Sequence, residues 1–338
     1  MVRAWNAEGH MVVAQIAYNH LDPAVKARCD ALIAAPLEYQ SSKSSTFVTA
    51  APWADDFKSQ LGTAIWHYID LPFSLDGTST SGVSTASFDI VRAIRQCVST
   101  LQDPDAGQTN LAISLRYLIH FAGDIEQPLH CSTAVSASSP AGDSGGNGFS
   151  LHGTWSNLHS LWDAGGGFLT DSLSRPLDTS SQSKLDAKVA LIETAHPYQP
   201  QTGVIPDPMD WAVEGWLLAQ SVCYSGVTKG ATPSAAYLNS ATNTTIQQMA
   251  EGGQRLAGLL NTIFAVQPFS LSVLAPAQGQ FGFSWSAVPG QIYRIQWKAH
   301  LDDPDWTDLT DVGAVTNSMS WSETAAEASR FYRVIISN

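Results

Sequence analysis

Apolar residues between about positions 5 and 265 recur every three or four residues, the spacing that places them on one face of an α-helix. This pattern predicts helices over the segments 11–21, 90–101, 111–125, 211–222 and 246–264. The intervening segments are rich in Ser, Thr and Gly, and we expect loops over 74–87, 132–148 and 165–183. Long loops around a helical bundle commonly line a functional site. The first part of the chain is therefore predicted to be mainly α-helical.

The pattern changes after residue 267, where apolar and polar residues alternate between turn residues. This alternation predicts strands over 281–285, 292–297 and 331–336, with a turn at 288–290. We therefore expect a small all-β sandwich over 267–338, similar in pattern to the fibronectin-III-like sandwiches appended to secreted bacterial enzymes. The predicted organisation is a short leading segment over 1–4, a helical domain over 5–266, and this sandwich.

Composition limits the ligands that the chain can bind over a broad surface. The 338 residues include 44% hydrophobic residues, enough to fill a core, and carry a net charge of −13. This acidic balance argues against a broad basic groove along a phosphate backbone, so a nucleic acid would be held locally, by metal cations and ring stacking. No run is long and apolar enough to span a membrane. Charged residues make up only 14%, which favours a secreted or periplasmic protein.

The four cysteines are widely spaced and include no C-x-x-C pair: Cys29, Cys97, Cys131 and Cys223. This spacing argues against a cysteine metal site or a thioredoxin-like motif. In an oxidising compartment they could form one or two disulfides. Buried free thiols are an equally good expectation, so the sequence leaves both alternatives open.

Two stretches of the helical part place a histidine and an aspartate four residues apart, His120 with Asp124 and His159 with Asp163. On a helix this spacing puts both side chains on one face, one turn apart. Imidazole nitrogens and carboxylate oxygens are the donors that zinc takes when thiolates are absent. An apolar helix that carries two such polar groups needs partners for them, and a metal ion supplies one.

The remaining histidines, taken singly, have ordinary interpretations. His67, and His10 near the start of an apolar helix, would each more often be core histidines with hydrogen-bond partners. Their convergence with the two pairs and with His130 favours metal binding instead. We expect the other four to be surface or helix-cap residues: His20, His152, His196 and His300.

Short motifs follow one another in a fixed order along residues 5–263. They are Trp5-Asn-Ala-Glu-Gly-His10, Trp53-Ala-Asp55, His67-Tyr-Ile-Asp70, Leu118 to His130, Gly145-Gly-Asn147, Asn157 to Asp163, Trp211-Ala-Val-Glu214 and Gly253-Gln-Arg-Leu-Ala257. Each motif is weak alone, but the ordered set is highly specific. Together they resemble the S1/P1 nuclease family, zinc-dependent nucleases related to bacterial zinc phospholipase C. The resemblance implies a helical phospholipase C/P1 nuclease-like catalytic domain.

The resemblance also implies three zinc ions, with Asp55 and Asp124 as catalytic ligands. The ligand groups are Asp55, His67 and His120, with Asp124 bridging to the second ion; His10 with the amine and carbonyl of Trp5; and His130, His159 and Asp163. Each group is small enough to leave a position open for water or phosphate, as catalytic zinc requires. The Trp5 nitrogen can serve only as a terminal amine, because an amide nitrogen has its lone pair delocalised.

Further roles near the metals follow from the same resemblance. Lys58 is catalytic in this interpretation, since it stands where family members place an Arg that steadies the phosphoryl charge. Lys supplies the charge but not the bidentate fork of Arg. Tyr68 would stack on a base, Asp70 would hydrogen-bond the base edge, and Asn147 would contact the substrate. Plain core packing is the alternative for Tyr68.

The expected activity is hydrolysis of phosphodiester bonds in single-stranded DNA and RNA to 5′-phosphate products, with 3′-nucleotidase activity on nucleotides. Two alternatives stay open: a zinc phospholipase C on the same scaffold, and a non-catalytic binding protein with structural zincs. Asp163 favours the nuclease, because the phospholipase C branch typically has Glu there. The C-terminal sandwich could bind a surface, a polysaccharide or the substrate, or merely cap the chain, and nothing in it identifies a ligand. The sequence does not set the oligomeric state.

The N-terminal residues generate a prediction about processing. Val2 and Ala4 resemble the −3 and −1 positions of a signal-peptidase site, so we expect residues 1–4 to be the remnant of a signal peptide. The mature protein should then begin at Trp5, whose free amine can bind zinc. N-terminal sequencing of protein from the native host checks this, and a stable Met1 terminus there would contradict it.

Overall fold

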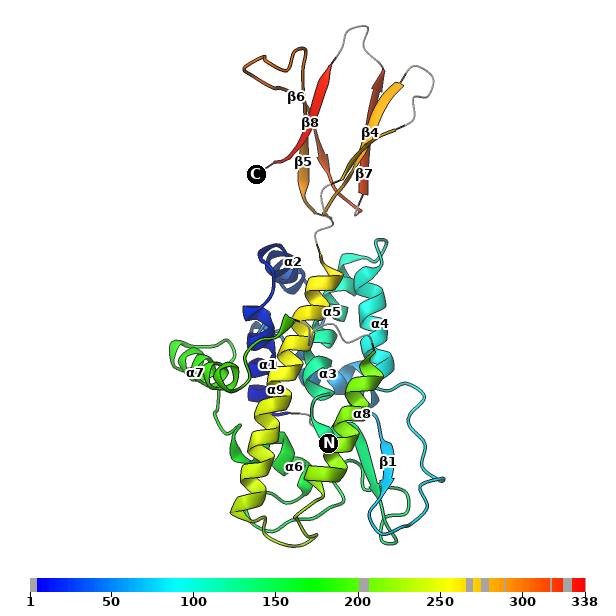
Figure 1. Cartoon of the computed structure of the whole chain (residues 1–338), viewed down its shortest axis with the longest axis vertical. Helices are drawn as coiled ribbons and strands as arrows, with labels where there is room; N and C mark the ends of the chain where they lie inside the picture. Colours follow the sequence, from blue (N-terminus) through cyan, green and yellow to red (C-terminus); the bar gives the residue numbers. More distant parts are fainter. Residues whose placement is uncertain are drawn as a thin grey trace. The chain divides into compact units, whose positions relative to one another are not determined.

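The computed structural model describes residues 5–200, 207–265, 270–274, 280–288, 290–316, 318–324 and 330–337. The chain forms two compact units, Met1–Phe264 and Ala265–Asn338, which are described separately below (Figure 1). The predicted segment 1–4 and the predicted boundary between residues 266 and 267 lie outside the described residues.

The first unit is built mainly of helices, as the apolar spacing predicts. Its α-helices are α1 Ala7–Asn19, α2 Pro23–Ala34, α3 Trp53–Leu61, α4 Ile90–Gln102, α5 Gln108–Asp124, α6 Leu158–Asp163, α7 Thr179–Ala195, α8 Pro208–Leu218 and α9 Ala235–Ile263. Short 3₁₀ helices are η1 Ser42–Ser44, η2 Ala64–His67, η3 Pro128–His130 and η4 Gly165–Gly167, and α8 continues into a π-helical turn, η6 Ala219–Cys223. Two short strands, β1 Leu71–Ser74 and β2 Ser132–Val135, complete the unit.

Capping side chains explain where several helices begin. The Asn6 side chain accepts a hydrogen bond from the backbone of Gly9 at 3.2 Å, so α1 begins at Ala7 rather than near Met11. Asp89 caps α4 in the same way, by accepting from the backbone of Arg92. The helices predicted over 90–101 and 111–125 are confirmed within a few residues.

Three predicted boundaries are wrong. Helix α9 begins at Ala235, well before residue 246, because Ser234 caps it and its first turns are also packed against the unit. The expected loop over 165–183 ends at Thr179, where α7 begins behind the capping residue Asp178. The expected loop over 132–148 starts as strand β2, which pairs in parallel with β1, Leu71 opposite Ser132.

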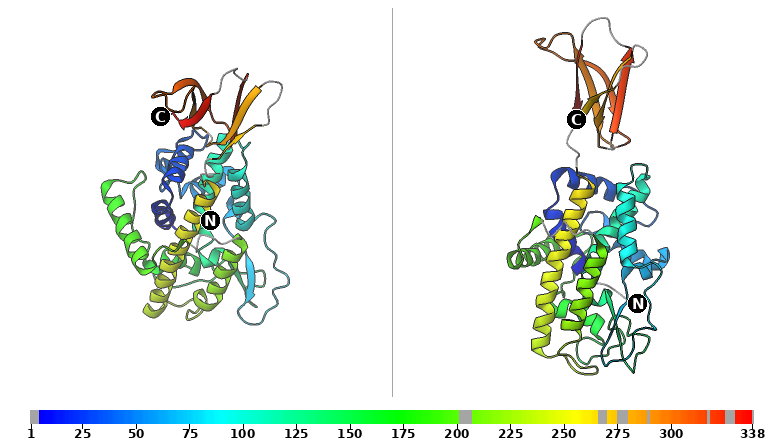
Figure 2. Two further views of the ribbon diagram at one scale, coloured as in Figure 1. Left: turned by 45° about the horizontal axis from the view of Figure 1, so that its top comes forward. Right: turned by 45° about the vertical axis from the view of Figure 1, so that its right-hand side comes forward.

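Helix α5 occupies the centre of the first unit. It packs against α1, α2, α3, α4 and α9, and the long α9 runs beside it and beside α1 (Figures 1 and 2). Every α5 residue from Ser114 to Asp124 is buried. Because polar His120 and Asp124 belong to this buried stretch, the core of the unit and its candidate chemistry share one helix.

The second unit is a sandwich of two antiparallel sheets. The strands are β3 Leu271–Val273, β4 Gln280–Ser286, β5 Ile292–Lys298, β6 Thr307–Gly313, β7 Ser318–Thr324 and β8 Phe331–Ile336. They form one sheet in the order β3-β4-β7 and another in the order β6-β5-β8. Phe283 and Trp285 of the first sheet pack against Tyr332 and Tyr293 of the second, so the inner faces share one core. The strands predicted over 281–285, 292–297 and 331–336 are confirmed. Pro289 of the expected turn lies outside the described residues.

Two further expectations can be compared with the structure. All four cysteines are buried free thiols, which decides between the two alternatives that their spacing leaves open. None of the described helices combines the length and apolar character that a bilayer crossing requires.

The crossing of α1 over α9 generates a stability prediction. A Cβ added to Gly253 would lie 2.4 Å from Cγ2 of Ile16 and 3.2 Å from the carbonyl oxygen of Val13, so the two helices would have to separate. We expect Gly253→Ala to lower the free energy of unfolding by about 1–3 kcal/mol, despite the higher helix propensity of Ala. Urea unfolding followed by circular dichroism measures this. Gly82→Ala is the control, since a Cβ there meets nothing within 4 Å; equal stabilities of the two variants would contradict the prediction.

Candidate metal centre

Three imidazoles converge on the buried carboxylate of Asp124. His120 precedes Asp124 by one turn of α5, and its Nε2 lies 3.1 Å from Asp124 Oδ2. His67, the last residue of η2, places Nδ1 2.9 Å from the same oxygen. His10, on α1, places Nε2 3.4 Å from Asp124 Oδ1. Side chains from three separate elements therefore meet at one residue, as the metal interpretation requires.

Asp55 of α3 completes this first cluster. Its Oδ1 lies 3.8 Å from both His67 Nδ1 and His120 Nε2. The Lys58 ammonium, one turn further along α3, lies 2.8 Å from the same oxygen. The Lys58 side chain is 9% exposed, so its charge lies in a poorly solvated position beside the cluster.

Three backbone carbonyls fix how three of the imidazoles are turned. Nδ1 of His120 lies 2.7 Å from the Ala51 oxygen, Nδ1 of His130 lies 2.7 Å from the His67 oxygen, and Nδ1 of His159 lies 2.7 Å from the Gly145 oxygen. A carbonyl can only accept, so each Nδ1 carries the proton in a neutral ring and donates it. Each Nε2 then keeps its lone pair, which is the arrangement that metal-ligating histidines adopt.

Several buried polar atoms of the first cluster lack a hydrogen-bond partner. Within the described residues, this holds for both ring nitrogens of His10, for Nε2 of His67 and for Oδ1 of Asp124. The His10 ring stacks on that of His120 with centroids 3.9 Å apart, and His67 Nδ1 lies 2.9 Å from Asp124 Oδ2, whereas Oδ1 of the same carboxylate has no hydrogen-bond partner. Unsatisfied buried polar groups are costly, and cations coordinated by these atoms would remove the cost. The residues present thus fit a metal site.

The charges of the cluster suit cation binding as well. Burial, and then the proximity of His120, lower the pKa of His10 to about 3, so His10 is a neutral ligand at ordinary pH. Burial opposes ionisation of Asp124, but His120 and His67 outweigh it and hold the pKa of Asp124 well below its usual range. Asp124 in turn raises the pKa of His120 against the effect of burial. A bound cation would replace the proton that the pair of His120 and Asp124 retains.

A second cluster joins His130 of η3 with His159 and Asp163 of α6. Their candidate ligand atoms all lie within 4.8 Å of one another. Nε2 of His159 lies 3.5 Å from Oδ1 of Asp163, and the two histidine rings have centroids 5.0 Å apart. Burial raises the pKa of Asp163 well above its usual range, although a hydrogen bond from Gln127 works in the opposite direction. The predicted third group of ligands therefore comes together.

The loop before α6 owes its shape to the predicted Gly-Gly-Asn motif. Gly145 has φ of 61°, and a Cβ there would lie 2.3 Å from the Leu129 carbonyl oxygen. Only glycine can therefore present this carbonyl to His159. The Asn147 amide donates to the Ser144 oxygen at 2.8 Å within the same turn, so its nearest contact is local.

Trp5 links the two clusters along the chain. Its side chain is fully buried, and the backbone N–H of the next residue, Asn6, donates to the carbonyl oxygen of Asp163 at 3.2 Å. His10, in the first turn after Asn6, belongs to the other cluster. A Cβ on Gly123 would lie 2.9 Å from His10 Nδ1 and 3.8 Å from the Trp5 ring, so glycine permits this close approach.

The predicted base-binding residues follow His67 directly. Tyr68 and Asp70 are partly buried, and the backbone N–H of Ile69 between them donates to the His130 oxygen at 2.8 Å. This segment therefore runs beside the second cluster. Burial, and then the charge of Asp143, raise the pKa of Asp70 to about 6.

Two polar contacts behind the ligands escaped the sequence analysis. Nη1 of Arg255 on α9 donates to both carboxylate oxygens of buried Glu126, at 2.7 and 2.9 Å, and Nη2 donates to Glu214. Gln127 donates to Asp163 at 2.8 Å. Gln127, Glu214 and Arg255 stand inside quoted motifs, but their partners lie 36 or more residues away, so spacing alone could not pair them.

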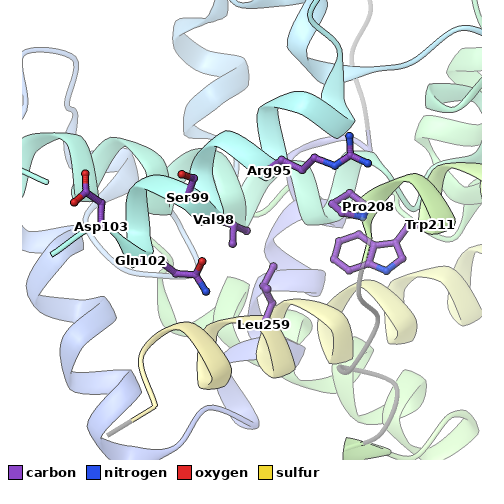
Figure 3. Close-up of a pocket in the computed structure, with 8 residues that line it drawn as sticks. All are labelled: Arg95, Val98, Ser99, Gln102, Asp103, Pro208, Trp211 and Leu259. Atoms are coloured by element: carbon purple, nitrogen blue, oxygen red, sulfur yellow. The ribbon is translucent and has the colours of Figure 1, made fainter. Parts of the chain in front are cut away.

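A separate cavity of about 520 Å³ lies between α4, α8 and α9 (Figure 3). None of its lining residues is a predicted site residue: Arg95, Val98, Ser99, Gln102, Asp103, Pro208, Trp211 and Leu259. Arg95 also pairs with Asp207, next to Pro208, at 2.6 Å. This cavity is thus distinct from the His and Asp clusters.

Comparison with known proteins matches most of the chain to one family. Residues 5–265 match the family model described as S1/P1 Nuclease. The chain is 29% identical to Endonuclease 2 of Arabidopsis thaliana over 285 residues, covering 78% of this chain and 91% of that protein. It is 29% identical to Nuclease P1 of Penicillium citrinum over 287 residues, which cover 77% of this chain and 97% of that protein. It is 26% identical to Nuclease S1 of Aspergillus oryzae over 167 residues, covering 47% and 53%.

The depressed pKa of His10 generates a prediction for the metal-free protein. The unfolded chain binds a proton on His10 near pH 6.5, whereas the folded chain binds it only near pH 3. The stability that His10 contributes is therefore complete above pH 6.5 and lost as the pH falls toward 3, by about 1 kcal/mol per pH unit. Chemical unfolding in chelator at several pH values measures this slope. We expect a shallower slope in His10→Gln, and an unchanged slope would contradict the assignment.

Proposed function

The chain belongs to the S1/P1 nuclease family, and from this we propose that it is a zinc-dependent endonuclease acting on single-stranded DNA and RNA. It hydrolyses phosphodiester bonds to 5′-phosphate products and also removes 3′-phosphates from nucleotides. The observation that carries this proposal is the convergence of His10, His67 and His120 on Asp124, with buried nitrogen and oxygen atoms left unsatisfied.

We assign three zinc ions to the two clusters. The ligand groups are Asp55, His67, His120 and the shared Asp124; His10 with the amine and carbonyl of Trp5; and His130, His159 and Asp163. The assignment is supported by donor atoms that lie within 4.8 Å of one another in each of three groups: His10, Asp55 and His120; His67, His120 and Asp124; and His130, His159 and Asp163. When bound, the zinc ions supply Lewis acidity and lower the pKa of coordinated water to about 7.

Lys58 supplies a further positive charge to the phosphoryl group. Its ammonium is held 2.8 Å from Asp55, which keeps the charge at the edge of the first cluster. The Lys58 side chain is 9% exposed, and this poor solvation strengthens the attraction to a phosphate. An ammonium acts as a point charge without the fixed geometry of a guanidinium, so Lys58 stabilises charge more than it orients the substrate.

Tyr68, Asp70 and Asn147 form the substrate subsite in this proposal. Tyr68 presents an aromatic ring for a base, and stacking tolerates any base because every base has a π face. Asp70 accepts hydrogen bonds from the base edge. A single strand is preferred because its bases can be turned out of the stack to reach these groups. Local contacts of this kind are compatible with a chain whose net charge is −13.

The second unit and the location of the protein complete the proposal. The sheet orders β3-β4-β7 and β6-β5-β8 support a fibronectin-III-like sandwich, because β3, β4 and β7 form one sheet and β5, β6 and β8 form the other. The low share of charged residues, 14%, supports a secreted or periplasmic location.

Phospholipase C chemistry is the competing enzymatic function. The same metal clusters could hydrolyse a phosphodiester in a phospholipid, but Asp163 occupies the position where that branch typically has Glu. A non-catalytic protein with structural zincs is the other alternative. The three-residue group His130, His159 and Asp163 argues against it, because a structural zinc site usually has four protein ligands and three leave a position open.

The decisive experiment compares substrates on protein that begins at Trp5 and is loaded with zinc. We expect cleavage of single-stranded DNA and RNA, no hydrolysis of phosphatidylcholine vesicles, and the loss of cleavage and of bound metal together in Asp124→Ala. Metal analysis by mass spectrometry beside the cleavage assay measures both. Asp186→Ala on α7 is the control, because Asp186 bonds only to Gln182 among the described contacts. Full activity in Asp124→Ala, or activity on vesicles alone, would refute the proposal.

A further inference from the structure

Gln127 lies between the two clusters and contacts the backbone of both. It follows α5, where its N–H donates to the carbonyl oxygen of Asp124 at 3.0 Å. Its own carbonyl accepts from the N–H of His130 at 2.9 Å. The Gln127 side chain is fully buried. It is neutral, and an amide is not one of the ligands that zinc usually takes. A buried amide in this position needs an explanation.

The orientation of the Gln127 amide is determined by its surroundings. The oxygen accepts from the backbone N–H of Leu129 at 2.6 Å, and an N–H can only donate. The amide nitrogen is therefore the other end, and it donates to Oδ1 of Asp163 at 2.8 Å. One side chain thus connects the turn after α5 to a carboxylate on α6.

The contact with Asp163 affects how that carboxylate can bind a metal. Oδ1 is already engaged by Gln127, and His159 Nε2 lies 3.5 Å from the same oxygen. A carboxylate held at one oxygen keeps a single rotamer and presents its remaining lone pairs in a fixed direction. Since the Gln127 backbone also contacts Asp124 and His130, a movement of either cluster changes the position of the amide.

We propose that Gln127 is a positioning residue, which orients Asp163 toward the metal held by His130 and His159 and fixes the separation of the two clusters. This inference rests on the proposed function, because it assumes that the second cluster holds zinc. In this role Gln127 does not need to contact a metal or the substrate. Its contribution is to hold a ligand in place, as hydrogen-bond partners of metal ligands commonly do.

A purely structural role for Gln127 would lie in its bond to Leu129, which caps η3. Gln127→Glu separates the two roles. The variant keeps an oxygen that accepts from Leu129, but it replaces the N–H donor with a second oxygen and places a like charge beside Asp163. Gln254→Glu is a matched control. Gln254 is also buried, accepts from the backbone of Gln199 at 3.2 Å and donates to the Pro197 carbonyl at 3.4 Å, far in sequence from any ligand carboxylate.

The test is a chelator titration of the full zinc-loaded protein, with bound zinc counted by mass spectrometry. We expect Gln127→Glu to release one zinc at a free-chelator strength about 10–100-fold lower than the wild type, while the other ions are retained. Gln254→Glu should match the wild type. Melting temperatures of the metal-free proteins should differ little between the two variants, because both keep a backbone hydrogen bond.

The outcomes separate the two proposals. If Gln127→Glu retains every zinc against the chelator as well as the wild type does, the role of Gln127 is overturned and the proposed function stays in place. A wild-type protein that takes up no zinc would overturn the proposed function itself. If Gln127→Glu does not fold, Gln127→Met removes the amide donor without adding a charge, although it also removes the bond to Leu129, and unchanged zinc retention in that variant would equally overturn the inference.

Discussion

The burial of Asp124 is the constraint on which the helical unit depends. Its carboxylate sits inside a helix that is packed on several sides, where an uncompensated charge costs several kcal/mol. The compensation arrives from separate parts of the chain, His10 on α1, His67 at the end of η2 and His120 on α5 itself. These segments can reach Asp124 only if their helices pack as they do, so folding and assembly of the donor set are one process.

A layer of polar contacts lies behind the ligands and ties α9 to the end of α5. Burial works against the Arg255 cation, but attraction to Glu126 and bonds to Glu214 outweigh it and raise the pKa of Arg255. The guanidinium also lies 5.6 Å from the centre of the Trp211 ring on α8. The turn that leads from Asp124 to His130 is therefore stabilised by ion pairs as well as by packing. This suits a segment that has a candidate metal ligand at each end.

The parts predicted from the sequence are those in which the signal is local. His120 with Asp124, and His159 with Asp163, stand out because one helical turn separates each pair, whereas the grouping of His10, Asp55 and His67 with particular metal ions comes only from the family resemblance. In the second unit, aromatic alternation identifies β4 and β5, but β6 and β7 are dominated by Thr, Asp and Ser and were missed. The start of α9 was missed for the same reason, because polar residues interrupt its apolar spacing. Contacts such as Arg255 with Glu126, and the pairing of β1 with β2, depend on the fold and leave no local trace.

The carbonyl oxygens that turn His120, His130 and His159 belong to the main chain, at Ala51, His67 and Gly145. The orientation of each imidazole ring therefore depends on the backbone path of a neighbouring segment. It does not depend on the side chain of the residue that supplies the carbonyl, except at Gly145, where a side chain has no room. Transplanting this centre into another scaffold would require three loop trajectories to be copied along with the ligands. A scaffold that received only the histidines and aspartates would contain the metal ligands but not the carbonyls that orient them.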